Sequence, residues 1–216
     1  MAHGRLRRYL VPGVLALVLS LAGCAGNKSG QAQEALQAVT SMQTLRQELV
    51  RGQTQVDDTV AALNQLASAS ADKLPLSYRA FNKQVGRMSD EAATARRLAN
   101  AMRDEWRNYL DSWEKENEQL SSPELRARLA ERRAAVEKNY ERLRDAARAL
   151  DQAYGPLLGN LRDIQTALSV DLTQAGVQAA QPAFENARRN AANLRQEMAN
   201  FITVIDEIQA VSPPRQ

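Results

Sequence analysis

The amino-acid sequence predicts an all-α protein, an elongated antiparallel four-helix bundle that runs up-down-up-down and packs by coiled-coil heptads. Apolar residues between about 30 and 210 recur in alternating steps of three and four, which is the spacing of one face of a helix. No stretch shows the period of two that a half-buried strand requires. Short breaks separate four long segments, and short turns place consecutive helices side by side and antiparallel. We therefore expect one domain with a long, thin core.

The first 23 residues have the pattern of a signal peptide. A basic start with three arginines precedes an apolar stretch over residues 9–21, which is too short to cross a bilayer comfortably. It ends in Leu21-Ala22-Gly23-Cys24, which resembles the lipobox of bacterial lipoproteins. We predict cleavage between Gly23 and Cys24 and lipidation of the Cys24 thiol, followed by a flexible tether over 24–30. An ordinary secretory signal with a chance cysteine is the alternative.

The first two helices are expected over residues 31–70 and 75–120. The apolar face of the first consists of Met42, Leu45, Leu49, Gly52, Val56, Thr59, Leu63 and Leu66. That of the second consists of Tyr78, Phe81, Val85, Met88, Ala92, Ala95, Ala99, Met102, Trp106, Tyr109 and Trp113. Asp72-Lys73-Leu74-Pro75 separates them, because proline disrupts a helix that continues past it.

The third and fourth helices are expected over residues 123–172 and 177–210, within a helical domain of residues 31–212 and before a tail at 213–216. Ser122 is a predicted N-cap, and Pro123 suits the first helical position. The apolar face of the third helix consists of Leu129, Val136, Tyr140, Leu143, Ala147, Leu150, Tyr154, Leu157, Leu161, Ile164 and Leu168. That of the fourth helix consists of Val177, Ala180, Phe184, Ala187, Ala191, Leu194, Met198, Phe201, Ile205 and Ile208. The heptad phase passes unchanged through Gly155-Pro156, so we expect one long, kinked helix there.

The register of the helices follows from the positions of the turns. Residues equally distant from the centre of a turn should face each other, which pairs Leu63 with Phe81 across the first turn. The same rule applied to all three turns places Gly52, Ala92, Leu150 and Met198 in one layer, where small residues meet large ones. Acids at the end of the second helix and arginines at the start of the third flank their common turn. We expect those arginines to neutralise the neighbouring helix, with anion binding as the alternative.

The composition argues against catalysis. The only histidine, His3, precedes the predicted cleavage site, and the only cysteine is Cys24. The chain from Cys24 onward therefore lacks the side chains of Cys/His and Ser/His/Asp catalysis and of Cys/His metal sites. No phosphate-binding glycine loop is present. We predict no catalytic residues, no metal site, no cofactor and no enzyme activity.

Residues 98–177 resemble a family of bacterial lipoproteins catalogued only as a domain of unknown function. The resembling segments are Asp104-Glu105-Trp106, the serine-proline turn followed by Leu125, Tyr140-Glu141-Arg142-Leu143, Pro156-Leu157-Leu158 and Leu168 to Leu172. The family has Lys-His where this chain has Ser169-Val170, so any role of that pair does not transfer. The resemblance implies a lipoprotein with long helices, and it implies no activity.

We expect a non-enzymatic lipoprotein of the cell envelope that acts as a helical scaffold or protein-interaction module. Three of the 28 lysines and arginines and none of the 25 acids precede Cys24, so the remaining chain has zero formal net charge and gives no reason to expect nucleic-acid binding. Ala25 after the cysteine favours the periplasmic face of the outer membrane over inner-membrane retention. The expected partners are the membrane, through the lipid, and an envelope protein. A carrier or chaperone for an apolar ligand such as a lipid is the alternative function.

The predicted contact surface lies at one end of the bundle. By the register, the fourth helix ends at Ala210, level with Asp104 and Lys138, and the hairpin beyond that level lacks a fourth helix. That hairpin includes Trp106, Tyr109 and Trp113, and aromatic side chains without enough core to cover them often bind partners. The alternative is that these aromatics pack against the early turns of the first helix and the arginine stems of the third.

Overall fold

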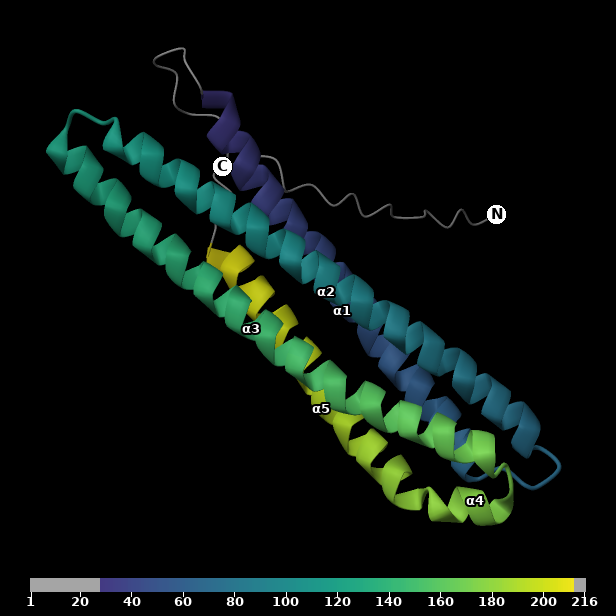
Figure 1. Ribbon diagram of the computed structural model, residues 1–216. Helices are drawn as coiled ribbons and strands as arrows, with labels where there is room; N and C mark the ends of the chain where they lie inside the picture. The colour runs from purple at the N-terminus through teal and green to yellow at the C-terminus, as the bar shows by residue number, and fades with distance from the viewer. Residues whose placement is uncertain (1–27, 212–216) are drawn as a thin grey trace, which may run out of the picture.

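The computed structural model describes residues 28–211 as five helices packed against one another (Figure 1). They are α1 (Lys28–Ala67), α2 (Leu74–Glu118), α3 (Pro123–Val170), α4 (Gln174–Ala179) and α5 (Gln181–Val211). No strand occurs among residues 28–211. The prediction of an all-α protein is therefore confirmed.

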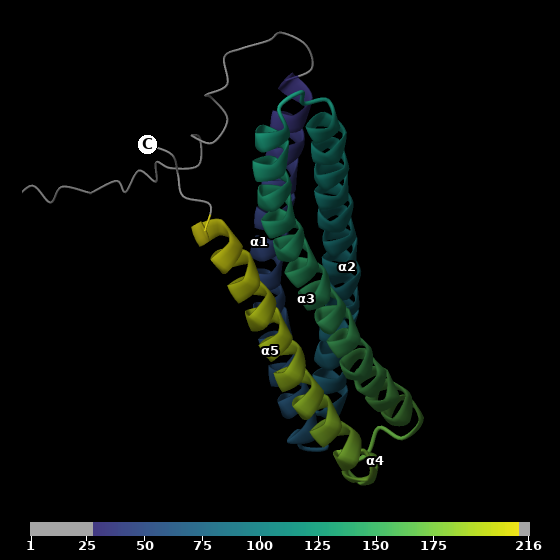
Figure 2. The same ribbon diagram turned by 90° about the vertical axis from the view of Figure 1, so that its left-hand side faces the viewer.

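The four long helices alternate in direction along the molecule, and the short α4 lies in the last turn (Figures 1 and 2). α1 packs mainly on α2, and α3 mainly on α5, while α2–α3 and α1–α5 contacts join the two pairs. Polar pairs show the register of α1 and α5: Arg46 with Asp206, Asp57 with Arg195, and Asn64 with Arg188. The spacing between these pairs is the same on both helices, as antiparallel neighbours require.

The segment predicted as a single helix over 177–210 is interrupted. α4 ends at Ala179 and α5 begins at Gln181, and the amide of Ala183 donates to the carbonyl of Ala180 at 2.9 Å. Pro182 explains the break, since its nitrogen has no hydrogen to donate and its ring displaces the carbonyl of the preceding turn. The apolar spacing continues across this proline, so periodicity alone did not reveal the interruption.

The predicted start and continuity of the third helix are confirmed. Ser122 is the N-cap of α3 and its hydroxyl accepts a hydrogen bond from the amide of Leu125 at 3.3 Å. α3 then continues through Pro156 to Val170 without a break. Figure 2 shows that the axis of α3 bends along its length, and a proline inside a helix is a common cause of bending.

The core is a continuous layer of side chains along the molecule, and most of the predicted apolar faces lie in it. Every predicted position on α1, α4 and α5 is buried, including Gly52 and Thr59, together with Ala180 between α4 and α5. The predicted positions that are only half-buried all lie on α2 and α3: Tyr78, Ala99, Tyr109, Trp113, Leu129, Val136, Tyr140 and Ala147. The α2–α3 seam is therefore the least completely packed part of the core.

Among the helices of residues 28–211, none combines the length and apolar character needed to cross a membrane.

Candidate functional site

The predicted cleavage and lipidation site, Gly23 and Cys24, lies outside the described residues. The structure therefore bears on the remaining candidates, the aromatic residues of α2. They lie towards the end of the molecule that contains the α2–α3 turn.

At this end the molecule has three helices instead of four. Figures 1 and 2 show that α5 ends well before the level of the α2–α3 turn, whereas α1 begins close to that level. Contacts agree with the picture, because Asp206 near the end of α5 pairs with Arg46, well after the start of α1. In the same way Glu207 pairs with Arg142, well after the start of α3. The first turns of α1 and α3 therefore lack the neighbour that α5 provides further along.

Trp106 lies in the core, which corrects the prediction that it forms part of a contact surface. Its side chain is 6% exposed, and its indole Nε1 donates a hydrogen bond to the backbone carbonyl of Ala38 at 3.2 Å. A buried indole N–H with an acceptor is stable in a core, so for Trp106 the alternative of packing against α1 holds.

Tyr109 and Trp113 remain half-buried and continue the aromatic row from Trp106 towards the turn. The ring centroids of Trp106 and Tyr109 lie 6.5 Å apart, and those of Tyr109 and Trp113 lie 5.6 Å apart, both in edge-to-face geometry. Burial raises the pKa of the Tyr109 hydroxyl, and the positive charge of Arg132 acts in the opposite direction. This row passes from the core to the surface, and only its outer two members can touch another molecule.

The arginines at the start of α3 bind neighbouring groups of the chain. Arg133 pairs with Glu114 of α2 at 2.9 Å and with Glu137 at 3.2 Å. Arg126 donates to the carbonyl of Leu120 at 2.6 Å. These contacts agree with the expectation that the arginines neutralise the adjoining helix.

Exposed apolar side chains occur at the same end of the molecule. Leu36 and Val39 of α1 are 53% and 36% exposed, and Leu125, just after the α2–α3 turn, is 47% exposed. Together with Tyr109 and Trp113 they form what we call the three-helix end surface. The sequence argument found its aromatic members but not its aliphatic ones, because Leu36, Val39 and Leu125 lie off the predicted apolar faces.

A half-buried acidic side chain beside the core was also missed from the sequence. Glu91 of α2 has a buried Oε1 with no hydrogen-bond partner among the described residues, and its pKa is raised to about 7. Burial is the main cause, and the negative charge of Glu48 on α1 adds to it, while Arg51 opposes it. Arg51 pairs with Glu48 at 2.7 Å. Gly52 opposite Glu91 is the only signal in the sequence that could have indicated room for this carboxyl group.

Within residues 28–211, no three or more histidine, cysteine, aspartate or glutamate side chains gather in a way that could hold a metal ion. A family model described as "Protein of unknown function (DUF2959)" matches residues 28–210. Neither the curated proteins nor the solved structures contain a match to this chain.

Proposed function

The chain belongs to the family of proteins of unknown function designated DUF2959, and from this starting point we propose that it is a non-enzymatic, lipid-anchored interaction module of the bacterial cell envelope. The observation that supports the proposal is the three-helix end surface. It combines exposed aliphatic residues with two half-buried aromatic rings where the fourth long helix is missing. Exposed apolar clusters of this kind commonly mark protein contacts.

The position of the surface fits an anchored protein. α1 begins at this end, so the segment that joins it to Cys24 starts there too. With cleavage before Cys24 and a lipid on its thiol, only a few residues separate the membrane from the start of α1. We propose that the surface faces the membrane or an envelope protein beside it, at the periplasmic face of the outer membrane. The residue after the cysteine, Ala25, favours that destination.

We further propose that the molecule has the architecture of an antiparallel up-down-up-down four-helix bundle with heptad packing, in which α4 is part of the last turn. The constant spacing of the α1–α5 polar pairs supports this, as does the burial of the predicted apolar faces. A long bundle suits a scaffold, because it holds one end at the membrane and extends the other away from it.

In-cell crosslinking tests the proposed surface. The double variant Tyr109→Ala/Trp113→Ala should keep its helicity and lose one or more crosslinked partners, because both rings lie at the edge of the core. The matched control is Leu76→Ala/Val170→Ala, which removes side chains that are 72% and 86% exposed at the opposite end. Unchanged crosslinks in the folded aromatic variant, or equal losses in both variants, would rule out the surface.

The anchor is tested separately. Cys24→Ser should abolish acylation and release the protein from the membrane fraction, because lipidation requires the thiol. A Cys24→Ser protein that stays in the membrane fraction after a salt wash would contradict the lipid anchor.

A further inference from the structure

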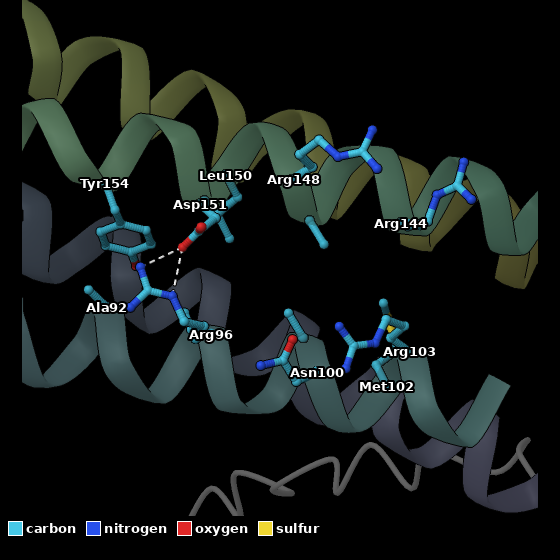
Figure 3. A pocket seen from close by; sticks show the side chains of 13 residues that line it. Ala92, Arg96, Asn100, Met102, Arg103, Arg144, Arg148, Leu150, Asp151 and Tyr154 are labelled. Atoms are coloured by element: carbon cyan, nitrogen blue, oxygen red, sulfur yellow. Dashed lines mark hydrogen bonds and ion pairs between the residues drawn. The ribbon is translucent and has the colours of Figure 1, made fainter. Parts of the chain in front are cut away.

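A pocket of about 320 Å³ lies between α2 and α3, on the incompletely packed seam and away from the three-helix end surface (Figure 3). Its residues come from these two helices alone: Ala92, Ala95, Arg96, Ala99, Asn100, Met102, Arg103, Arg144, Ala147, Arg148, Leu150, Asp151 and Tyr154. This volume is at the lower end of the range for small-molecule sites in proteins.

The pocket exists because small residues face each other across the seam. By register, Ala95 of α2 lies opposite Ala147 of α3, and Ala92 and Ala99 flank Ala95 on its own helix. Elsewhere in the core a small residue faces a large one, as Gly52 faces Met198. With alanine on both sides, no side chain fills the space between the helix backbones. The floor of the pocket is therefore apolar.

The rim of the pocket is positively charged. Four arginines and one aspartate line it, and two further aspartates pair with these arginines, Asp145 with Arg144 and Arg148 and Asp104 with Arg103, so an excess of one positive charge remains. Arg96 pairs with Asp151 at 2.6 Å, and Arg144 and Arg148 share Asp145 at 3.4 and 3.5 Å. These arginine side chains are 43–62% exposed. Exposed pairs of this kind contribute little, so a guanidinium can exchange its partner for an anionic ligand at small cost.

Tyr154 provides a polar group at the end of the pocket that Arg96 and Asp151 also line. Its ring lies beside Arg96 and Asp151 in Figure 3. The residue is 2% exposed, and its hydroxyl has no hydrogen-bond partner among the described residues. Burial, together with the charges of Glu91 and Glu48, raises its pKa, so the hydroxyl keeps its proton and remains a donor. A buried donor without an acceptor is unfavourable, and a ligand oxygen that accepts its hydrogen bond would remove that cost.

We propose that this pocket binds a single-chain anionic amphiphile, a fatty acid being the simplest example. The alkyl chain lies on the floor of alanines with Met102 and Leu150, and the anionic head lies at the end of the pocket where Arg96 and Tyr154 are side by side. The excess positive charge selects an anion over an uncharged or cationic amphiphile. This binding is independent of the three-helix end surface. It gives a ligand class to the alternative function, a carrier for an apolar ligand such as a lipid.

Binding of decanoate to the full chain with Cys24→Ser, in detergent-free buffer, tests the proposal by calorimetry. We expect one decanoate per chain, with decanol binding at least tenfold more weakly and decyltrimethylammonium not at all. Ala147→Leu should fill the pocket and weaken decanoate binding at least tenfold. The matched control, Ala134→Leu, adds the same side chain at an exposed position of α3 and should leave binding unchanged.

Two further variants separate the head-group contacts from packing. Tyr154→Phe should weaken decanoate binding about tenfold without lowering the melting temperature, because the lost hydroxyl has no partner in the chain. Arg96→Ala should weaken decanoate binding about fivefold and leave decanol binding unchanged, whereas Arg87→Ala, at an exposed position of the same helix, should change neither. Decanoate binding no tighter than decanol binding, or equal effects of Ala147→Leu and Ala134→Leu, would overturn the proposal.

Discussion

Gly52 of α1 and Met198 of α5 approach so closely that a Cβ on residue 52 would lie 2.8 Å from Cε of Met198. Oε1 of Glu91, on α2, would lie 3.1 Å from the same Cβ. Three helices therefore converge on a position that has no side chain. The register deduced from the sequence placed Gly52 and Met198 in one layer, and this contact confirms it.

A large side chain at residue 52 should destabilise the protein. Leucine there has to displace Met198 and Glu91, and overpacking of this kind costs about 1–3 kcal/mol. Gly86 of α2 provides the matched control, because a Cβ there has nothing within 4 Å. Gly86→Leu should raise the free energy of unfolding by about 0.5–1 kcal/mol, since glycine is unfavourable inside a helix. Urea unfolding measures both, and equal effects would contradict the close approach.

Gly176→Ala should destabilise the turn between α3 and α5. A Cβ on residue 176 would lie 2.1 Å from the backbone carbonyl oxygen of Asp171, and a backbone atom cannot move aside as a side chain can. The amide of Gly176 also donates to the hydroxyl of Thr173, which caps α4. We expect a loss of about 1–3 kcal/mol. Gly159→Ala in α3, with open space around its Cβ, should be neutral or stabilising in the same thermal melts.

The two tryptophans should differ in their contribution to stability. Trp106→Ala removes a buried indole and its hydrogen bond to Ala38, and we expect a loss of about 3–5 kcal/mol in the free energy of unfolding. Trp113→Ala removes a half-buried ring near the α2–α3 turn and should cost much less. Chemical denaturation of the two single variants measures the difference. If Trp113→Ala proved as costly as Trp106→Ala, Trp113 would belong to the core and not to the contact surface.

The fold could be predicted because nearly all of its determinants are local. Heptad spacing predicts the helices, and proline, glycine and the capping Ser122 predict most of the turns. Pro182 was overlooked because the spacing of apolar residues continues past it, although the missing N–H interrupts the backbone hydrogen bonds. The spacing of apolar residues depends on side chains alone, so it gives no information about a backbone N–H that is missing.

The candidate sites were harder to predict, since they depend on how far helices separate. The sequence shows alanines at 92, 95, 99 and 147, but small residues either let helices approach or leave a cavity between them. Only the structure distinguishes the two outcomes, with a close approach at Gly52 and a pocket at Ala95 and Ala147. Trp106 was misplaced for a related reason: the register placed it near the level where α5 ends, but could not show that its ring is buried there and bonded to the carbonyl of Ala38.

Stability should depend on pH through Glu91. Its pKa is raised from 4.5 to about 7 by burial and by the charge of Glu48. Between these two pH values the carboxyl group is protonated in the folded protein and ionised in the unfolded chain. Its favourable contribution is therefore fully present below about pH 4.5 and is lost as the pH rises through about 7. Glu91→Gln keeps the shape of the side chain without the charge. The variant should therefore gain stability relative to the wild type as the pH rises from 4.5 to 8.

Urea unfolding at a series of pH values between 4.5 and 8 measures this gain, with Glu141→Gln as the matched control. Glu141 lies exposed on α3, so its substitution changes the net charge by the same amount without touching the core. The difference in unfolding free energy between Glu91→Gln and Glu141→Gln should widen steadily between pH 4.5 and 7 and then level off. Above that range the Glu91 carboxyl of the wild type is ionised in both the folded and the unfolded protein. A constant difference across the series would mean that the folded protein does not hold the Glu91 proton, and the carboxyl group would then have to reach water or an unrecognised partner.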